Sequence, residues 1–215
     1  DHDLLDAEMN LVKGDIVRLG YRRITIKSDN EVGLLAFLRG LRRHLGVEMV
    51  DASPETSCEH DPSSNGSAEC GVGLAKGLIW TVRSALVDRL GVDIPDDHPL
   101  ITWIVQYAGA VQRRFSLGED GRTPVERISG SKCHQHMAHF GERVWWMPLD
   151  VRFEKDLPNP GDRFREGYWV GPVDGQHQSY ILTPQGAVRC RTYRRRSEAE
   201  RFHRDILECK ASFLL

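Results

Sequence analysis

Two acidic residues stand where carboxylates are able to hold a metal ion. Asp29 follows residues 23–27, whose β-branched and polar side chains alternate as in a strand, and Glu69 opens a helical stretch after the polar segment 62–68. A carboxylate at a strand end is held rigidly at the open edge of a sheet, and a neighbouring helix can bring a second one there. Such hard oxygen ligands suit Mg²⁺ or Mn²⁺, and two of these ions can activate an attacking oxygen and stabilise a leaving one in phosphoryl transfer. We therefore predict that Asp29 and Glu69 are catalytic and metal-binding residues.

Ordinary local chemistry also accounts for both acidic residues. An aspartate after a strand, followed by an asparagine such as Asn30, is common in turns. A glutamate such as Glu69 in the first turn of a helix is favoured by the helix dipole alone. The pair by itself therefore leaves a metal site and a simple turn with a helix start as alternatives.

A cluster of five arginines near the C-terminal end is the second candidate site. Its members are Arg189, Arg191, Arg194, Arg195 and Arg196. Residues 186–204 contain 7 Arg and 2 Glu, a net charge of +5, whereas residues 1–66 contain 12 Asp and Glu against 8 Lys and Arg, a net charge of −4. Arginines can neutralise DNA phosphates without reading the base sequence. We predict that these arginines bind DNA; the alternative is a solvated strand edge followed by a helix start.

Cysteine and histidine residues gather between Cys133 and His139, which invites comparison with a zinc site. The ligands are crowded, and no second Cys/His pair lies at the usual distance from them. We therefore favour a linker with a contact surface over a structural zinc site. The whole chain has 5 cysteines and no CxxC pair, which indicates a reducing intracellular compartment rather than a disulfide framework.

The elements that would position these residues follow from the hydrophobic pattern. The expected helices are residues 4–20, about 34–46, 67–90 and 99–115, and the expected early strands are residues 23–27 and 47–50. A strand, a helix, a second strand and further helices are typical of an α/β fold. After Phe140, short β-type runs alternate with Gly- and Pro-containing turns, which predicts a small all-β, barrel-like module.

The domain organisation expected from this pattern has three parts. Residues 1–130 form an α/β core, residues 131–196 form the small β module, and residues 197–215 form a charged tail that could be helical. No apolar stretch approaches the ~18 residues of a membrane span, so we expect no membrane partner. The chain opens on Asp1 rather than Met and enters a helix almost at once, so we expect it to be part of a longer protein.

Five segments in chain order resemble the integrases of retroviruses and, more closely, of copia-type retrotransposons. They are residues 28–31 (SDNE), 62–69 (PSSNGSAE), 121–127 (GRTPVER), 140–144 (FGERV) and 167–171 (GYWVG), so that the resemblance runs through most of residues 10–195. It implies a ribonuclease-H-like core with three acidic metal ligands, of which Asp29 matches the second and Glu69 the third. It also implies that Asn30 supports Asp29.

The resemblance further implies a metal-dependent polynucleotidyl transferase that joins the DNA ends of the element to target DNA. The loop before Glu69 would touch DNA through Ser63, Ser64, Asn65 and Gly66. The cofactor would be Mg²⁺ or Mn²⁺, and the partners would be element-end DNA, target DNA and further copies of the protein. The parent protein would act inside the cell, in the nucleus.

Two departures from the family pattern limit this interpretation. The two acids are separated by 39 residues (69 − 29 = 40 positions), against thirty-five in the retroviral pattern. The first acid should lie on a strand several tens of residues before Asp29, and the early aspartates, Asp1 to Asp15, lie in or beside a predicted helix. We therefore expect an integrase core that is truncated at its N-terminus, is catalytically incomplete and has exposed strand edges. The alternatives are a non-catalytic nucleic-acid-binding or assembly module and an inert relic.

Overall fold

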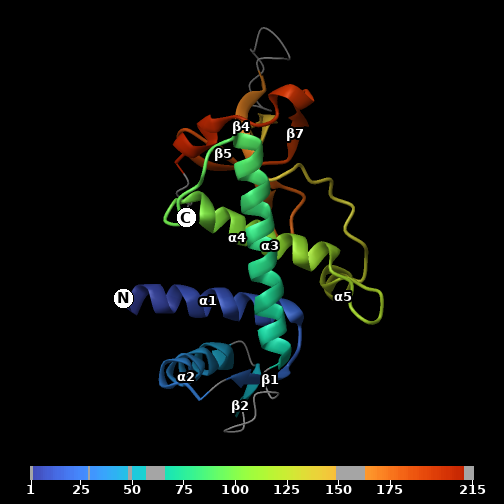
Figure 1. The fold of residues 1–215 in the computed structure, drawn as a ribbon. Helices are drawn as coiled ribbons and strands as arrows, with labels where there is room; N and C mark the ends of the chain where they lie inside the picture. The colour runs from blue at the N-terminus through green and yellow to red at the C-terminus, as the bar shows by residue number, and fades with distance from the viewer. Residues whose placement is uncertain (1, 29, 48–49, 57–65, 149–162, 211–215) are drawn as a thin grey trace. The chain divides into compact units, whose positions relative to one another are not determined.

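The computed structural model describes residues 2–28, 30–47, 50–56, 66–148 and 163–210 (Figure 1). These residues form two compact units, Asp1–Gly73 and Leu74–Leu215. The fold is mixed α/β, with a small parallel sheet in the first unit and a five-stranded antiparallel sheet in the second. This agrees with the two kinds of structure expected from the sequence, although the units divide within a helix and not at residue 130.

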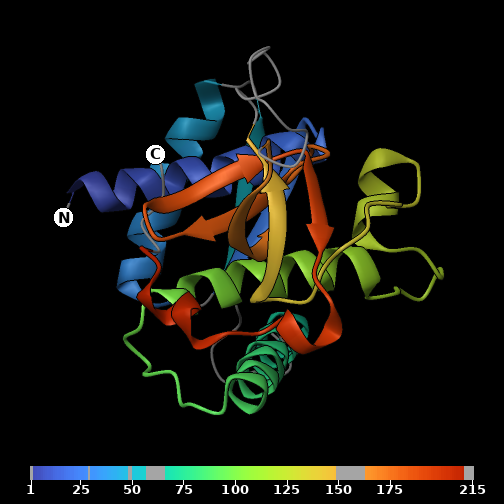
Figure 2. The ribbon, with the colours of Figure 1, turned by 90° about the horizontal axis from the view of Figure 1, so that it is seen from above.

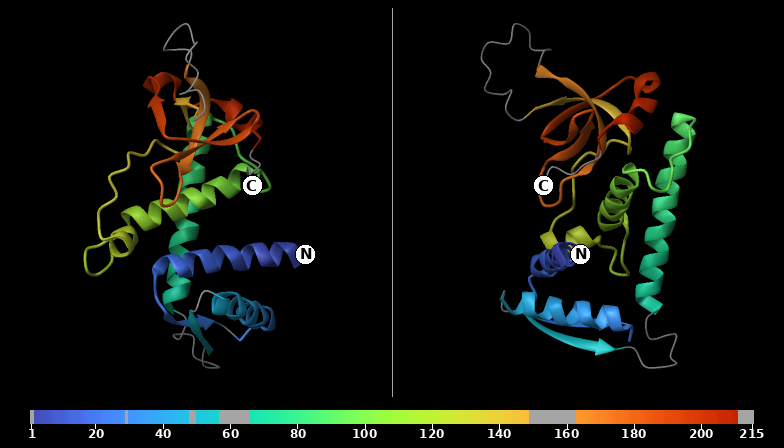
Figure 3. Two further views of the ribbon diagram at one scale, coloured as in Figure 1. Left: turned by 180° about the vertical axis from the view of Figure 1, so that it is seen from behind. Right: turned by 90° about the vertical axis from the view of Figure 1, so that its left-hand side faces the viewer.

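The first unit is a strand–helix–strand arrangement preceded by a helix. Its elements are α1 (His2–Leu19), β1 (Arg23–Ser28), α2 (Val32–Val47) and β2 (Asp51–Thr56). β1 and β2 pair in parallel, with Arg23 opposite Asp51 and Ser28 opposite Thr56. Parallel neighbours need a crossover connection, which α2 provides (Figure 3).

The core of the first unit comes from the leucines of α2. Leu38, Leu41 and Leu45 are spaced three and four residues apart, so they lie on one helix face, and they are buried with Ala52 of β2. Ile24 and Ile26 of β1 pack against this cluster. The alternation in β1 therefore places its isoleucines toward the helix, as the sequence predicts.

Strand β2 differs from the sequence prediction, which placed the strand at residues 47–50 and a loop from residue 51. Its sequence is polar and contains Pro54, so the hydrophobic pattern does not show it. Backbone pairing with β1 defines this strand, supported by Arg23–Asp51 and Lys27–Glu55 ion pairs of 3.7 and 3.5 Å. Pro54 is tolerated because β2 pairs with β1 alone among the described residues, and an edge strand can lack one N–H.

Helix α3 (Gly66–Leu90) is longer and more apolar than the other described helices. By length and composition it is the one described helix that could cross a membrane. Its apolar residues do not form an uninterrupted run in the sequence, because Lys76 and Arg83 lie among them. Within the second unit its C-terminal half packs into the protein core through Leu86 and Leu90. The Arg83 guanidinium there forms an ion pair of 2.7 Å with Asp96.

The second unit combines the end of α3 with further helices and the antiparallel sheet. Its other elements are α4 (Leu100–Phe115), α5 (Pro124–Ser129), β3 (Glu142–Met147), β4 (Arg165–Pro172), β5 (Ser179–Thr183), β6 (Gly186–Cys190), β7 (Thr192–Arg195) and the 3-10 helices η4 (Glu198–Glu200) and η5 (Arg204–Glu208). Figure 2 shows α4 lying along the curved sheet.

The antiparallel sheet is rolled into a barrel-like shape, and its strand order requires this. The order is β6-β5-β4-β3-β7, so that β6 and β7 are the two outer strands. In a flat sheet they would lie roughly 19 Å apart, four spacings of ~4.8 Å. Arg191 alone separates Cys190 of β6 from Thr192 of β7, and two residue steps span at most about 7.6 Å. The sheet therefore curls until its two edges meet at Arg191, as the predicted barrel-like module requires.

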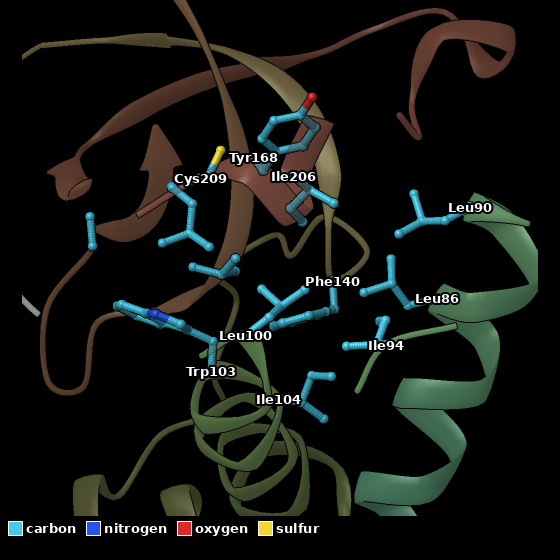
Figure 4. Packing of buried hydrophobic residues seen from close by; sticks show 13 residues of the cluster. Leu86, Leu90, Ile94, Leu100, Trp103, Ile104, Phe140, Tyr168, Ile206 and Cys209 are labelled. Atoms are coloured by element: carbon cyan, nitrogen blue, oxygen red, sulfur yellow. The ribbon is translucent and has the colours of Figure 1, made fainter. Parts of the chain in front are cut away.

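The main core of the second unit lies between the helices and the sheet. Figure 4 shows Leu86 and Leu90 of α3 and Trp103 and Ile104 of α4 packed together with Tyr168 of β4. A second cluster inside the curled sheet includes the buried side chains of Val144, Trp146, Trp169, Ile181 and Cys190. Because α4 packs against β4, α4 and the adjoining α5 belong with the β module and not with the first unit.

The described part of the predicted charged tail is packed into the fold. Ile206 and Cys209 are buried in the main core. The Arg204 guanidinium donates to the carbonyl oxygens of Leu90 and Gly91 at 2.9 and 3.1 Å. Within the predicted charged tail, 197–215, the described residues 197–210 therefore include apolar side chains that lie between the charges and reach the core.

Candidate nucleic-acid interface

The predicted metal ligand Asp29 and most of the predicted DNA-contacting loop before Glu69 lie outside the described residues. Asp29, Ser63, Ser64 and Asn65 are among the undescribed positions, so their predicted roles are neither supported nor contradicted. β1 ends at Ser28, directly before Asp29, and α3 begins at Gly66, with Glu69 in its first turn. The distance between the two predicted metal ligands therefore stays a prediction.

Glu69 has a carboxylate that is accessible to a metal ion. Its side chain is exposed, and it has no ion pair with another described residue. One exposed carboxylate fits the oxygen chemistry of Mg²⁺ or Mn²⁺ but does not make a site by itself. Among the described residues, including 133–139, no group of three or more His, Cys, Asp or Glu side chains is placed to hold a metal ion.

The alternation of β7 places two of the five predicted DNA-binding arginines on opposite sides of the sheet. In the pairing of β3 with β7, Val144 lies opposite Arg195, and Trp145 lies opposite Arg194. Val144 is buried and Trp145 is exposed, so Arg195 shares the inner side of the sheet and Arg194 the outer side.

Arg195 is held by a buried carboxylate. Glu142, with 0% of its side chain exposed, accepts hydrogen bonds from Nε and a terminal nitrogen of Arg195 at 2.7 and 2.8 Å. Glu142 also accepts from the His139 backbone N–H at 3.0 Å, and Arg201 lies 3.4 Å away. Burial by itself raises the pKa of Glu142, but the bonds from Arg195 and His139 outweigh it and lower the pKa below its ordinary value. Arg195 thus neutralises a buried charge.

Arg196 is also used within the fold. It forms an ion pair with Glu166, and its guanidinium lies over the Trp145 ring, 4.3 Å from the centroid. Only 9% of its side chain is exposed. Arg195 and Arg196 therefore hold the closing strand of the sheet, a role that the sequence could not distinguish from phosphate binding.

The three other arginines are exposed and have no acidic partner among the described residues. Arg189 lies over the Tyr180 ring at 5.7 Å, and Arg194 lies over the Phe164 ring at 4.9 Å. Arg191 occupies the corner between β6 and β7. Their guanidinium groups can form bidentate hydrogen bonds with phosphate oxygens.

A pocket of about 490 Å³ opens beside the corner at Arg191. Its walls come from residues 135–137, His177 with Ser179, and residues 191–193 with Arg195. The Tyr193 hydroxyl donates to the His136 carbonyl at 2.9 Å, and the Gln135 amide donates to the Gln178 carbonyl at 3.0 Å. These bonds fasten segment 135–137 against the sheet.

In the sequence, the two groups of residues that line this pocket give separate signals. The stretch from Cys133 to His139 resembles a zinc site, and the arginines indicate DNA binding. Residues 135–137 and 191–193 are more than fifty positions apart, and only the curling of the sheet brings them together. The Tyr193–His136 hydrogen bond leaves no periodic signal in the sequence.

Comparisons with known proteins show a weak similarity to solved structures and none to a family model or a curated protein. No protein-family model matches the sequence, and no curated protein matches it. Among solved structures, the chain is similar to one from the cryo-electron microscopy structure of the simian T-cell lymphotropic virus intasome in complex with the PP2A regulatory subunit B56 gamma. The identity is 13% and the TM-score is 0.41. The match covers 89% of this chain and 64% of that chain, so this chain spans less than two thirds of its length.

Proposed function

We propose that this chain derives from a retrotransposon integrase and that its second unit binds DNA through the phosphate backbone. The observation that carries the proposal is the set of three exposed arginines on the curled sheet: Arg189, Arg191 and Arg194 have no acidic partner among the described residues. The neighbouring Arg195 and Arg196 are neutralised by Glu142 and Glu166. Of the five predicted arginines, these three therefore have guanidinium groups that are available to a polyanion.

Contacts of this kind bind DNA of any sequence and weaken steeply with salt. Each neutralised phosphate releases condensed counterions, so the logarithm of the binding constant falls with the logarithm of salt concentration. The test is fluorescence anisotropy of the full chain on a labelled DNA duplex at several NaCl concentrations. Replacing Arg189, Arg191 and Arg194 together by glutamine should reduce the salt slope by roughly 0.9 for each phosphate that the variant no longer neutralises.

A matched control is available on α2. Arg39, Arg42 and Arg43 are exposed there, and replacing all three by glutamine makes the same change in net charge. This control should leave the salt slope close to that of the unchanged chain. An equal reduction in both triple variants would show that total charge, and not the β module, determines binding, and the proposal would then fail.

We also propose that the parent integrase holds Mg²⁺ or Mn²⁺ with Asp29 and Glu69. The supporting observations are that β1 ends at Ser28 and that Glu69 is exposed in the first turn of α3. When bound, such ions activate an attacking water or DNA 3′-hydroxyl for phosphodiester transfer. The residues of this chain would supply two carboxylates, and Gly66 with its preceding loop residues would contact DNA. The parent protein would act on element-end and target DNA in the nucleus, as a homo-oligomer.

The metal proposal is tested by binding and not by turnover, because the first acid of the family pattern is not found in this chain. Mn²⁺ binding to the full chain, followed by electron paramagnetic resonance, should be lost in both Asp29→Asn and Glu69→Gln. Asp15→Asn, on α1, provides a control that removes the same charge. Metal affinity that survives both site changes would show that the assignment is wrong.

A further inference from the structure

The pocket beside Arg191 is lined by both cationic and aromatic side chains. Arg191 is the single residue between β6 and β7, and its exposed side chain lines the pocket. None of the described residues that line the pocket is acidic. The other lining arginine, Arg195, is bound to Glu142, so Arg191 is the uncompensated positive charge of this pocket.

The groups around Arg191 are hydrogen-bond donors. The hydroxyl-bearing residues Ser179 and Thr192 and the imidazole-bearing residues His136 and His177 line the same pocket. Hydroxyl and imidazole N–H groups can donate to anionic oxygens, and hydrogen bonds to a charged group are stronger than those between neutral groups. Together with Arg191, these side chains are therefore suited to bind an anion with several oxygens.

The pocket is also lined by Tyr193 and Met137, and the Tyr193 side chain is held in place. Tyr193 packs on Trp169 inside the sheet, with 6.3 Å between ring centroids, and its hydroxyl is bonded to the His136 carbonyl. Met137 adds an apolar side chain to the lining. With its hydroxyl already engaged, Tyr193 offers the pocket a positioned ring, and bases stack on such rings without regard to sequence.

We propose that this pocket binds one nucleotide of a single-stranded nucleic acid, with its phosphate at Arg191 and its base against Tyr193 and Met137. The inference deepens the proposed function, on which it rests for its choice of ligand. The volume of about 490 Å³ is in the range of small-molecule sites. A base within a duplex is stacked and paired and cannot enter, so the pocket would select unpaired ends or flipped nucleotides.

The test uses the full chain and the 5′-phosphorylated dinucleotide pTpT, titrated by isothermal calorimetry or NMR. Arg191→Gln should weaken pTpT binding about tenfold or more, because it removes a charged hydrogen-bond donor to phosphate. His177→Glu places an acid on an exposed lining position and should weaken binding by a comparable factor. Arg39→Gln removes the same charge as Arg191→Gln at an exposed position on α2, outside the pocket. It should change the affinity by less than roughly threefold.

Competitors separate the parts of the ligand. Unphosphorylated TpT and inorganic phosphate should each compete more weakly than pTpT. Inorganic phosphate that competes as well as pTpT would show an anion site without a base-binding wall and would overturn the proposal. Equal affinity in Arg191→Gln and Arg39→Gln would overturn it as well.

Failure of this inference is distinguishable from failure of the proposed function. If duplex DNA binds with the expected salt slope while pTpT binding is absent or insensitive to Arg191→Gln and His177→Glu, the pocket is not the site and the phosphate-binding surface stands. If pTpT binding depends on both residues while duplex binding is absent, the pocket inference stands and the duplex-binding function fails.

Discussion

The two units bury apolar surface very differently. Among the described residues, the first unit has one hydrophobic cluster, of which Leu38, Leu41 and Leu45 supply most of the volume. The second unit has two clusters, with Trp103 and Trp169 fully buried and the carboxylate of Glu142 enclosed. A single helix face on a two-stranded sheet gives little core, whereas a curled sheet has an interior and an outer face that can both be covered. We infer that the second unit provides most of the stability of the chain.

Removing a large side chain from the second unit should have the greatest effect. Trp169 lies inside the curled sheet with 0% exposed, so Trp169→Ala should lower the free energy of unfolding by about 3–5 kcal/mol. Urea unfolding followed by amide hydrogen exchange checks this, with protection falling first in β3 to β7. Protection that falls equally in α2 would show that the two units unfold together.

The corresponding change in the first unit should be smaller for the whole molecule. Leu41 is buried, and Leu41→Ala should destabilise the first unit by about 2–3 kcal/mol, at the lower end of such substitutions because a small core can collapse around the gap. Hydrogen exchange in α1, α2 and β1 should accelerate while β3 to β7 keep their protection. Leu11→Ala, at an exposed position on α1, is the control.

The buried ion pair should make the second unit sensitive to acid. Because the pKa of Glu142 is lowered in the folded state, its stabilising contribution is complete above the ordinary carboxyl value of 4.5 and is lost as the pH falls below 4.5 through the lower folded-state pKa. Glu142→Gln should cost about 2 kcal/mol at neutral pH, the range for hydrogen bonds to charged groups. The variant and the unchanged chain should converge in stability in acid. A constant difference at all pH values would contradict this account.

The smallest expected effect concerns α5, at the periphery of the second unit. Thr123 accepts a hydrogen bond from the Glu126 N–H at 3.2 Å, and the Glu126 carboxylate accepts from the Thr123 N–H at 2.7 Å. Thr123→Ala removes one half of this capping box and should cost about 1 kcal/mol. Local hydrogen exchange in α5 is the sensitive measurement, since β3 to β7 should be unaffected; Thr123→Ser retains the cap and is the control.

Sequence patterns predict the elements whose buried residues recur with a regular period. The helices α2, α3 and α4 are predicted within a few residues. The pattern misses β2 because backbone pairing defines this strand and its side chains are polar. It also misses the docking of residues 197–210, which depends on Ile206 and Cys209 meeting helices that lie a hundred positions earlier.

The candidate site is predictable by residue type but not by orientation. A run of arginines gives no sign that Arg195 faces inward to Glu142, because Glu142 lies 53 positions away along the chain. The segments that resemble integrases contain residues with structural roles here. Gly141 has a φ of 76°, and a side chain there would meet Leu86 at 2.7 Å, so the turn before Glu142 requires glycine.

The one-residue link at Arg191 also sets an order of events during folding. β7 pairs with β3, whose residues are made some fifty positions earlier, whereas β5 and β6 pair with near neighbours in sequence. Pairings between distant segments form slowly because a long loop must close first. During synthesis on the ribosome, we therefore expect β3 to lack its second partner, β7, until Arg195 has emerged. We expect the Glu142 carboxylate to be exposed to water until then. Closing the sheet and neutralising this charge are one late step, so any delay in synthesising residues 192–210 prolongs the time during which the module is incomplete.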